Sequence, residues 1–194
     1  VHPRFGEPGD RVSLRDRLGL DLDLPVVLQL AGGFGVGPIE KIFRALLQVE
    51  VPAQIVAVTG RNEEARAQLA RVEIPSRHRA KVLGFTEAIH DWMTAADLVV
   101  SKPGGLTSSE ALAVGLPMVI VNPVPGQESR NNDFLLENGA AVKANGLASI
   151  QLKVERLLSD RERLSRLAAN ARAIARPAAA FDVARYALST ASRG

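Results

Sequence analysis

The alternation of short apolar runs with helical patterns between residues 26 and 144 limits the possible folds more than any other feature. The runs are rich in Val and apolar at nearly every position, as is typical of strands buried on both faces of a parallel sheet. They are residues 26–31, 53–59, 81–84, 97–101, 117–122 and 140–144. The helical patterns lie at 37–49, 62–71, 87–96, 106–115 and 129–138. This order predicts an α/β fold, a Rossmann-like doubly wound parallel sheet with helices on both faces.

The two ends of the chain differ from this middle part. Residues 146–176 have helical periodicity, Pro177 interrupts it, and residues 179–191 resume it. The first 25 residues begin VHPRFGEPGD, which reads as a linker, and the first residue is Val rather than Met. We therefore expect residues 1–25 to be an interdomain linker region and residues 26–194 to be one domain with C-terminal helices. The chain is expected to be the rear part of a longer protein.

Composition excludes several classes of function. There are no cysteines, which rules out disulfides, thiolate metal sites and a Cys nucleophile, and three His are too few for a His metal cluster. The net charge of +3 with a pI of about 9.7 favours anionic ligands or an anionic membrane surface. Aromatic residues, at 4%, are too few for stacking nucleic-acid bases. No apolar run reaches the ~18 residues of a membrane span, so we expect a cytoplasmic location.

Ligands of doubly wound folds bind beyond the C-terminal ends of the strands. The first such loop, AGGFGVGP, holds Gly33, Gly35 and Gly37, whose backbone N–H groups can approach an anion ahead of a helix N-terminus. The loop lacks the Gly-Lys-Ser/Thr of a P-loop and the G-x-G-x-x-G of a dinucleotide site. A tight structural turn is the alternative. Arg61, after the second predicted strand, is either an anion ligand or a solvated helix start.

The later loops carry the remaining candidates. Phe85 and Thr86 follow the third strand, where an aromatic ring and free backbone groups can meet a base, although Phe85 is alternatively a core residue. In SKPGGLTSSE, Thr107 and Glu110 have the spacing of a helix capping box, so Glu110 either caps the helix or binds a ligand. The next loop, PGQESRNN, is dense in amides and carboxylates that suit sugar hydroxyls. A nucleotide sugar fits these loops together.

Several pieces together carry a resemblance to a known family: AGGFGVGP, TGRNE, GFTEAIHDWM, SKPGGLTSSEAL, GLPMVI, PGQE and NGAAV, in this order over residues 26–145. The chain resembles the donor-binding half of GT-B fold glycosyltransferases, specifically the MurG-related family of monogalactosyldiacylglycerol synthases and processive diacylglycerol glucosyltransferases. The resemblance implies that Glu110 binds ribose and that the backbone at Thr86, beside Phe85, reads uracil. It places near the diphosphate Gly33 to Gly37, Lys102, Gly105, Leu106 and Thr107, and near the sugar Gln127, Glu128 and Asn131.

The resemblance also implies an activity. The expected donor is UDP-galactose or UDP-glucose, the expected acceptor a lipid such as diacylglycerol, and transfer inverts the anomeric centre. No cofactor or metal is implied. The acceptor site and general base belong to the family's N-terminal domain, so the catalytic base is unknown and the chain alone is expected to be inactive. The whole protein is expected at the cytoplasmic face of a membrane. Alternatives are a nucleotide-sugar 2-epimerase-like isomerase, a nicotinamide-dependent oxidoreductase and a non-catalytic UDP-sugar-binding module.

The arginines of the C-terminal region leave two interpretations open. Arg161, Arg163, Arg166, Arg172 and Arg176 follow one another along the predicted helix of residues 146–176. They can contact anionic lipid, or they can form the solvated face of that helix.

Overall fold

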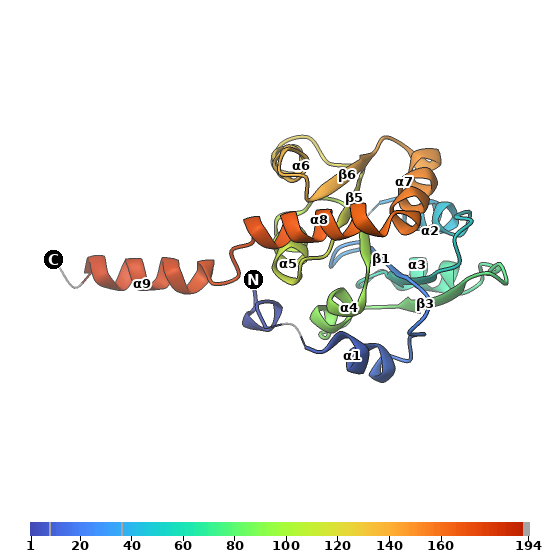
Figure 1. The fold of residues 1–194 in the computed structure, drawn as a ribbon, viewed down its shortest axis with the longest axis horizontal. Helices are drawn as coiled ribbons and strands as arrows, with labels where there is room; N and C mark the ends of the chain where they lie inside the picture. Colours follow the sequence, from blue (N-terminus) through green and yellow to red (C-terminus); the bar gives the residue numbers. More distant parts are fainter. Residues whose placement is uncertain (8, 36, 192–194) are drawn as a thin grey trace.

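A six-stranded parallel sheet forms the centre of the molecule (Figure 1). The computed structural model describes residues 1–7, 9–35 and 37–191. The strands are β1 Val26–Leu30, β2 Gln54–Val58, β3 Arg79–Leu83, β4 Leu98–Ser101, β5 Met118–Val121 and β6 Ala141–Ala144. Their order is β3-β2-β1-β4-β5-β6, and every neighbouring pair is parallel. The predicted Rossmann-like doubly wound fold is confirmed, with its topological switch between β1 and β4.

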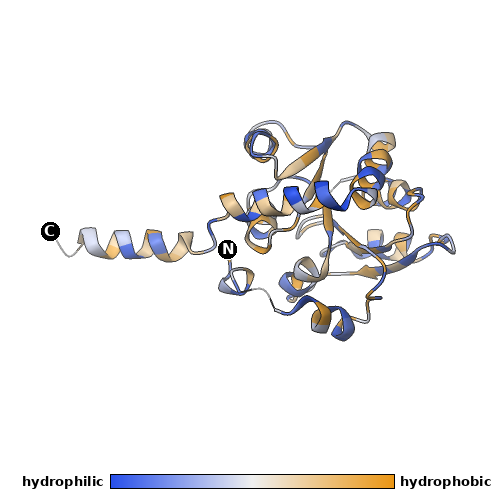
Figure 2. Ribbon diagram, viewed as in Figure 1, coloured by the Kyte–Doolittle hydropathy of each residue, from blue (hydrophilic) through white to orange (hydrophobic). Residues whose placement is uncertain are grey.

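Helices cover both faces of this sheet. They are α2 Ile39–Leu46, α3 Glu63–Leu69, α4 Ile89–Ala95, α5 Gly105–Val114, α6 Gln127–Glu137, α7 Leu147–Ser159, α8 Arg161–Ile174 and α9 Ala179–Ala191. One apolar core lies between the sheet and α2, α3 and α7, and the other lies between the sheet and α4, α5 and α6. Both faces of β1, β2, β4 and β5 are buried, which explains why these strands are apolar at most positions. Figure 2 shows hydrophobic residues along the central strands.

Residues 1–25, which were predicted to be an interdomain linker region, are folded against the domain. The 3₁₀ helix η1 (Pro3–Phe5) and helix α1 (Arg11–Arg17) pack onto the domain and bury Phe5, Leu14 and Leu20 in its core. The opening VHPRFGEPGD is rich in Gly and Pro and reads as a linker, but α1 begins directly after it. The folded unit therefore extends beyond residue 26 toward the N-terminus.

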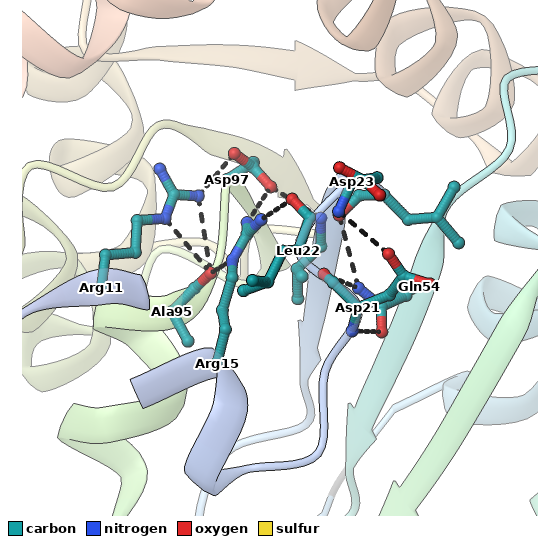
Figure 3. Close-up of polar contacts among 10 residues, drawn as sticks. Arg11, Arg15, Asp21, Leu22, Asp23, Gln54, Ala95 and Asp97 are labelled. Carbon is teal, nitrogen blue, oxygen red and sulfur yellow. Dashed lines mark hydrogen bonds and ion pairs between the residues drawn. The ribbon is translucent and has the colours of Figure 1, made fainter. Parts of the chain in front are cut away.

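One carboxylate fastens this N-terminal segment to the sheet (Figure 3). Asp97, at the start of β4, accepts hydrogen bonds from Arg11 and from Arg15, whose Nη2 lies 2.6 Å away. The same carboxylate accepts from the Val26 backbone N–H at 2.7 Å. Arg15 is buried and also donates to the carbonyl oxygens of Ala95 and Leu22. The beginning of β1, the beginning of β4 and α1 are therefore joined at a single ionic cluster.

The helical pattern at residues 146–176 is two helices rather than one. Asp160 leaves the helical conformation, with φ −120° and ψ 84°, and its side chain caps α8 by accepting from the Arg163 N–H at 2.9 Å. Each helix turns an apolar side toward the core, where Leu157 of α7 and Leu167 and Ala171 of α8 are buried. Helix α9 extends away from the rest of the molecule (Figure 1), and its residues are exposed. In the described part of the chain, no helix is long and apolar enough to cross a membrane.

Candidate functional site

A cavity of about 210 Å³ opens at the switch point, where the C-terminal ends of β1, β4 and β5 meet. Five of the residues predicted for ligand binding line it together: Gly33, Gly37, Lys102, Thr107 and Glu128. They come from the segments that follow β1, β4 and β5, including the first turns of α5 and α6, which are distant in sequence and adjacent in the sheet order. This is the position at which open α/β sheets bind their ligands.

The glycine-rich loop after β1 is hydrogen-bonded to the β2–α3 turn on one side and has free space on the other. Asn62 donates its side-chain amide to the Gly35 carbonyl at 2.8 Å, and the Arg61 backbone N–H donates to the Gly33 carbonyl at 3.1 Å. Gly35 has φ +63°, and a Cβ there would lie 2.2 Å from the Thr59 carbonyl oxygen. At Gly33, by contrast, a Cβ would meet no atom within 4 Å. The loop therefore packs closely against the β2–α3 turn while leaving space for a ligand above Gly33.

Two alanine substitutions in this loop are expected to have different effects. Gly35→Ala should lower the free energy of unfolding by at least about 1–2 kcal/mol, because a side chain is disfavoured in left-handed backbone. Gly33→Ala should leave stability nearly unchanged and weaken the binding of a diphosphate, since its methyl group would project into open space. Urea denaturation and calorimetric titration with UDP measure the two effects. Equal destabilisation by both substitutions would contradict this account of the loop.

Helix α5 begins earlier than the capping-box pattern predicts. Its N-cap is Gly104, whose carbonyl accepts from the Ser108 N–H at 2.9 Å, so Thr107 is the third helical residue. The capping-box interpretation of Thr107 and Glu110 is therefore wrong, and among the described residues no side chain caps α5. The first N–H groups of a helix lack intrahelical partners. At α5 they lie beside the cavity that Gly104 and Thr107 line, which is a favourable place for an anion.

Glu110 is consequently not occupied with capping its own helix. It is half-buried on α5, and burial raises the pKa of its carboxyl above the ordinary range. It does not line the 210 Å³ cavity. A carboxylate kept partly out of water without a capping role fits a residue that meets a ligand, as the resemblance implies, and the ribose role stays a prediction.

The raised pKa of Glu110 predicts a pH dependence of stability. The folded state holds the proton to a higher pH than the unfolded state does, so stability falls as pH rises from the ordinary glutamate pKa through the higher folded-state pKa. Glu110→Gln should remove this loss. The variant is therefore expected to match or exceed the parent chain in stability at pH 7, with the difference shrinking below pH ~4. Urea denaturation across pH 4–8 tests this, and a variant less stable at pH 7 would refute it.

The loop between β5 and α6 leads into the predicted sugar-binding residues, which lie in the first two turns of α6. Glu128 faces the cavity, but its Oε2 also accepts from the Val124 N–H at 2.7 Å, so this carboxylate holds the loop in shape. Asn131 donates to the Pro103 carbonyl at 2.8 Å and thus joins this loop to the β4–α5 turn. A Cβ on Gly105 would lie 3.7 Å from the Gln127 Nε2. The loops after β4 and β5 are therefore in contact.

The remaining predicted residues do not line the 210 Å³ cavity. Gly105, Leu106, Gln127 and Asn131 line a neighbouring cavity of about 540 Å³ between α5 and α6. Arg61 and Phe85 contact each other instead, with the guanidinium carbon 5.3 Å from the ring centroid. The Thr86 side-chain oxygen accepts from the Ala88 N–H at 3.1 Å. Arg61 therefore lies over an aromatic ring and is not among the residues that line the 210 Å³ cavity, and its role as an anion ligand stays a prediction.

Comparison with known proteins places this geometry in a family. The model of the family described as Glycosyl transferases group 1 matches residues 12–174. The chain belongs to this family.

Named relatives agree with this assignment. The group 1 domain is 35% identical to a probable monogalactosyldiacylglycerol synthase 2 of Oryza sativa subsp. japonica, over 90% of this chain and 38% of the relative. It is 31% identical to a processive diacylglycerol beta-glucosyltransferase of Bacillus licheniformis, over 90% of this chain and 45% of the relative. The predicted resemblance is confirmed. The chain spans less than half the length of these two relatives.

Solved structures share the fold. MurG of Acinetobacter baumannii superimposes with a TM-score of 0.71 and 27% identity, over 92% of this chain and 53% of that chain. Anabaena Alr3699/HepE in complex with UDP-glucose superimposes with a TM-score of 0.67 and 22% identity, over 96% of this chain and 52% of that chain. The sheet and its helices are therefore those of one half of a GT-B glycosyltransferase.

Sequence reasoning missed several residues that line the cavity of this glycosyltransferase domain. Gln29 lies in β1 with its Nε2 donating to the Ile39 carbonyl at 2.9 Å, and its buried Oε1 has no partner among the described residues. Phe34 is 79% exposed at the tip of the glycine-rich loop. Asn122 has φ 43° at the end of β5. Gln29 could have been found from the sequence, because an amide is unusual inside an apolar strand. No feature of the sequence pointed to Phe34 or Asn122.

Within residues 1–7, 9–35 and 37–191, no three His, Asp or Glu side chains gather in a way that could hold a metal ion.

Proposed function

We propose that this chain is the nucleotide-sugar-binding domain of an inverting glycosyltransferase. It transfers galactose or glucose from a UDP-sugar to a lipid acceptor, with diacylglycerol as the expected acceptor. The observation that carries the proposal is the cavity at the switch point, where the glycine-rich loop, the uncapped start of α5 and Lys102 converge. All three are chemical features that hold phosphate groups.

The relatives support the choice of substrates. Two are named for synthesis of monogalactosyldiacylglycerol and for processive glucosylation of diacylglycerol, and the Anabaena structure that shares the fold contains UDP-glucose. Because the relatives are more than twice as long as the matched region, we propose that acceptor binding and the general base reside outside this chain. The isolated chain would then bind donor without transferring the sugar.

The proposed chemistry follows from where charge develops. An acceptor hydroxyl attacks the anomeric carbon from the face opposite UDP, the bond to the diphosphate oxygen breaks, and UDP leaves with added negative charge. Backbone N–H groups at the start of α5 and the Lys102 ammonium would stabilise that charge, because they are already oriented before the reaction begins. We propose that this domain binds its donor without a metal ion or another cofactor.

The site of action is part of the same proposal. A lipid acceptor would place the full-length protein at the cytoplasmic face of a membrane through peripheral contact, and the pI of about 9.7 is compatible with an anionic surface.

Calorimetric titration of the 194-residue chain with UDP, UDP-galactose, UDP-glucose and NAD tests the proposal. We expect saturable binding of UDP and of one of the two UDP-sugars, and none of NAD. Tight binding of NAD without binding of uridine ligands would overturn it. The preferred UDP-sugar would identify the hexose.

A further inference from the structure

A second cavity, of about 980 Å³, lies at the opposite edge of the sheet from the donor cavity. Pro25, Asp97 and Pro117 line it. They are the residues immediately before β1, β4 and β5, respectively. Helix α1 forms one wall, and α8 forms another along most of its length. Since the donor cavity lies at the C-terminal ends of the same three strands, the sheet separates the two cavities. We call this second space the rear cavity.

Positive charge predominates in the rear cavity. Four arginines line it, Arg11, Arg15, Arg161 and Arg172, against the two carboxylates of Asp23 and Asp97. The three guanidinium nitrogens of Arg15 donate hydrogen bonds to the Ala95 carbonyl, the Leu22 carbonyl and the Asp97 carboxylate (Figure 3). Arg11 shares the same Asp97 carboxylate, and its side chain is 44% exposed. Asp97 thus faces two guanidinium groups, and the lining as a whole has net positive charge because Arg161 and Arg172 add to them.

Two of the four arginines of α8, Arg161 and Arg172, line the rear cavity, and both residues are exposed. Neither Arg161 nor Arg172 forms an ion pair within the described residues, whereas Arg166 on the same helix pairs with Glu162 at 3.0 Å. Arg161 is the first residue of α8, where the helix dipole disfavours a cation. Arg172 lies eleven positions after Arg161, which corresponds to a rise of about 16 Å along the helix. The cavity therefore presents unpaired guanidinium groups at both ends of α8.

The sequence leaves room for the Arg172 side chain. A Cβ on Gly115, whose φ is +68°, would lie 2.4 Å from the Arg172 Nε, so a larger residue at this position would displace the guanidinium group. Between the arginines the rear cavity is lined by apolar side chains, namely Leu22, Met93, Leu116, Leu158 and Leu164. Its occupant should therefore combine an anionic group with an apolar part.

We propose that the rear cavity binds a phosphate ester, separately from the donor site. Guanidinium groups form paired hydrogen bonds with phosphate oxygens, and Arg161, Arg172 and Arg11 have donors to offer. The ester is either soluble or the headgroup of an anionic lipid, because both present the same phosphate chemistry. The inference does not depend on the donor being a UDP-sugar.

The test is an amide NMR titration of the 194-residue chain with sn-glycerol 3-phosphate at constant ionic strength. Gly9 and Gly115 report on the rear cavity, and Gly33 and Gly104 report on the donor cavity. We expect saturable shifts of Gly9 and Gly115, and an affinity for glycerol phosphate that falls at least tenfold in R161Q/R172Q. The matched control, R166Q/R185Q, removes two charges from exposed pairs and should titrate like the parent chain. R161Q alone leaves the Arg172–Gly115 contact intact and guards against misfolding of the double variant.

A second arm separates the two sources of phosphate. Flotation with phosphatidylglycerol-containing vesicles, compared with pure phosphatidylcholine vesicles, identifies a lipid headgroup if R161Q/R172Q loses binding and R166Q/R185Q keeps it. Binding of glycerol phosphate without vesicle binding identifies a soluble ester. Equal losses in the two double variants, or no response of Gly9 and Gly115 with no vesicle binding, would overturn the proposal. Shifts at Gly33 and Gly104 without shifts at Gly9 and Gly115 would also overturn the rear-cavity proposal. They would not count against the proposed donor site.

Discussion

Asp97→Ala is expected to lower the free energy of unfolding by about 3–5 kcal/mol, the usual cost of breaking a buried ion pair from one side. Asp97 accepts from Arg11, from Arg15 and from the Val26 N–H. Arg15 is only 8% exposed, so its guanidinium would lose its one carboxylate partner while remaining largely out of water. The substitution should also loosen α1, because this carboxylate joins α1 to the starts of β1 and β4.

Urea denaturation followed by circular dichroism measures this effect, and Asp91→Ala is the matched control. Asp91 pairs with Arg17 at 2.8 Å, but the Arg17 side chain is 63% exposed, so its loss should cost under about 1 kcal/mol. Similar small losses in both variants would show that the Asp97 cluster does not hold the N-terminal segment. Hydrogen exchange at α1 amides, faster in Asp97→Ala than in Asp91→Ala, would localise the effect.

Glu110→Gln is expected to weaken UDP binding by at least tenfold. If the carboxylate accepts two hydrogen bonds from the ribose hydroxyls, removing its charge weakens both, and hydrogen bonds to charged groups are worth about 1.5–3 kcal/mol each. The amide keeps the size and shape of the side chain. The structure assigns Glu110 no capping function that the substitution would remove.

Calorimetry with UDP measures the change, and Glu137→Gln at the exposed end of α6 serves as a control of equal charge. Retained stability with lost affinity would assign Glu110 to the ligand. Unchanged UDP affinity in Glu110→Gln would remove Glu110 from the binding site and leave its burial in α5 without a functional reason. A loss of the same size in Glu137→Gln would attribute the effect to net charge.

The candidate site was partly predictable from local sequence. Gly33, Gly37, Thr107 and Glu128 were selected from the segments that follow apolar runs, Lys102 was selected from the family resemblance, and the structure gathers all five at one cavity. The start of α5 was not predictable in the same way. Thr107 and Glu110 satisfy the spacing of a capping box, but Gly104 adopts the extended backbone of an N-cap and begins the helix three residues earlier. A local pattern compatible with two helix starts does not choose between them.

The sequence by itself determined the parallel sheet and the edge at which its loops converge, because alternating apolar runs and helical periods are properties of neighbouring residues. Tertiary structure alone decided how the N-terminal segment attaches, since Arg15 and its partner Asp97 are 82 positions apart. It also decided that Arg61 stacks on Phe85, and that Arg161 and Arg172 share a cavity with α1. Contacts of this kind depend on which elements the completed fold brings side by side, and no local pattern encodes that proximity.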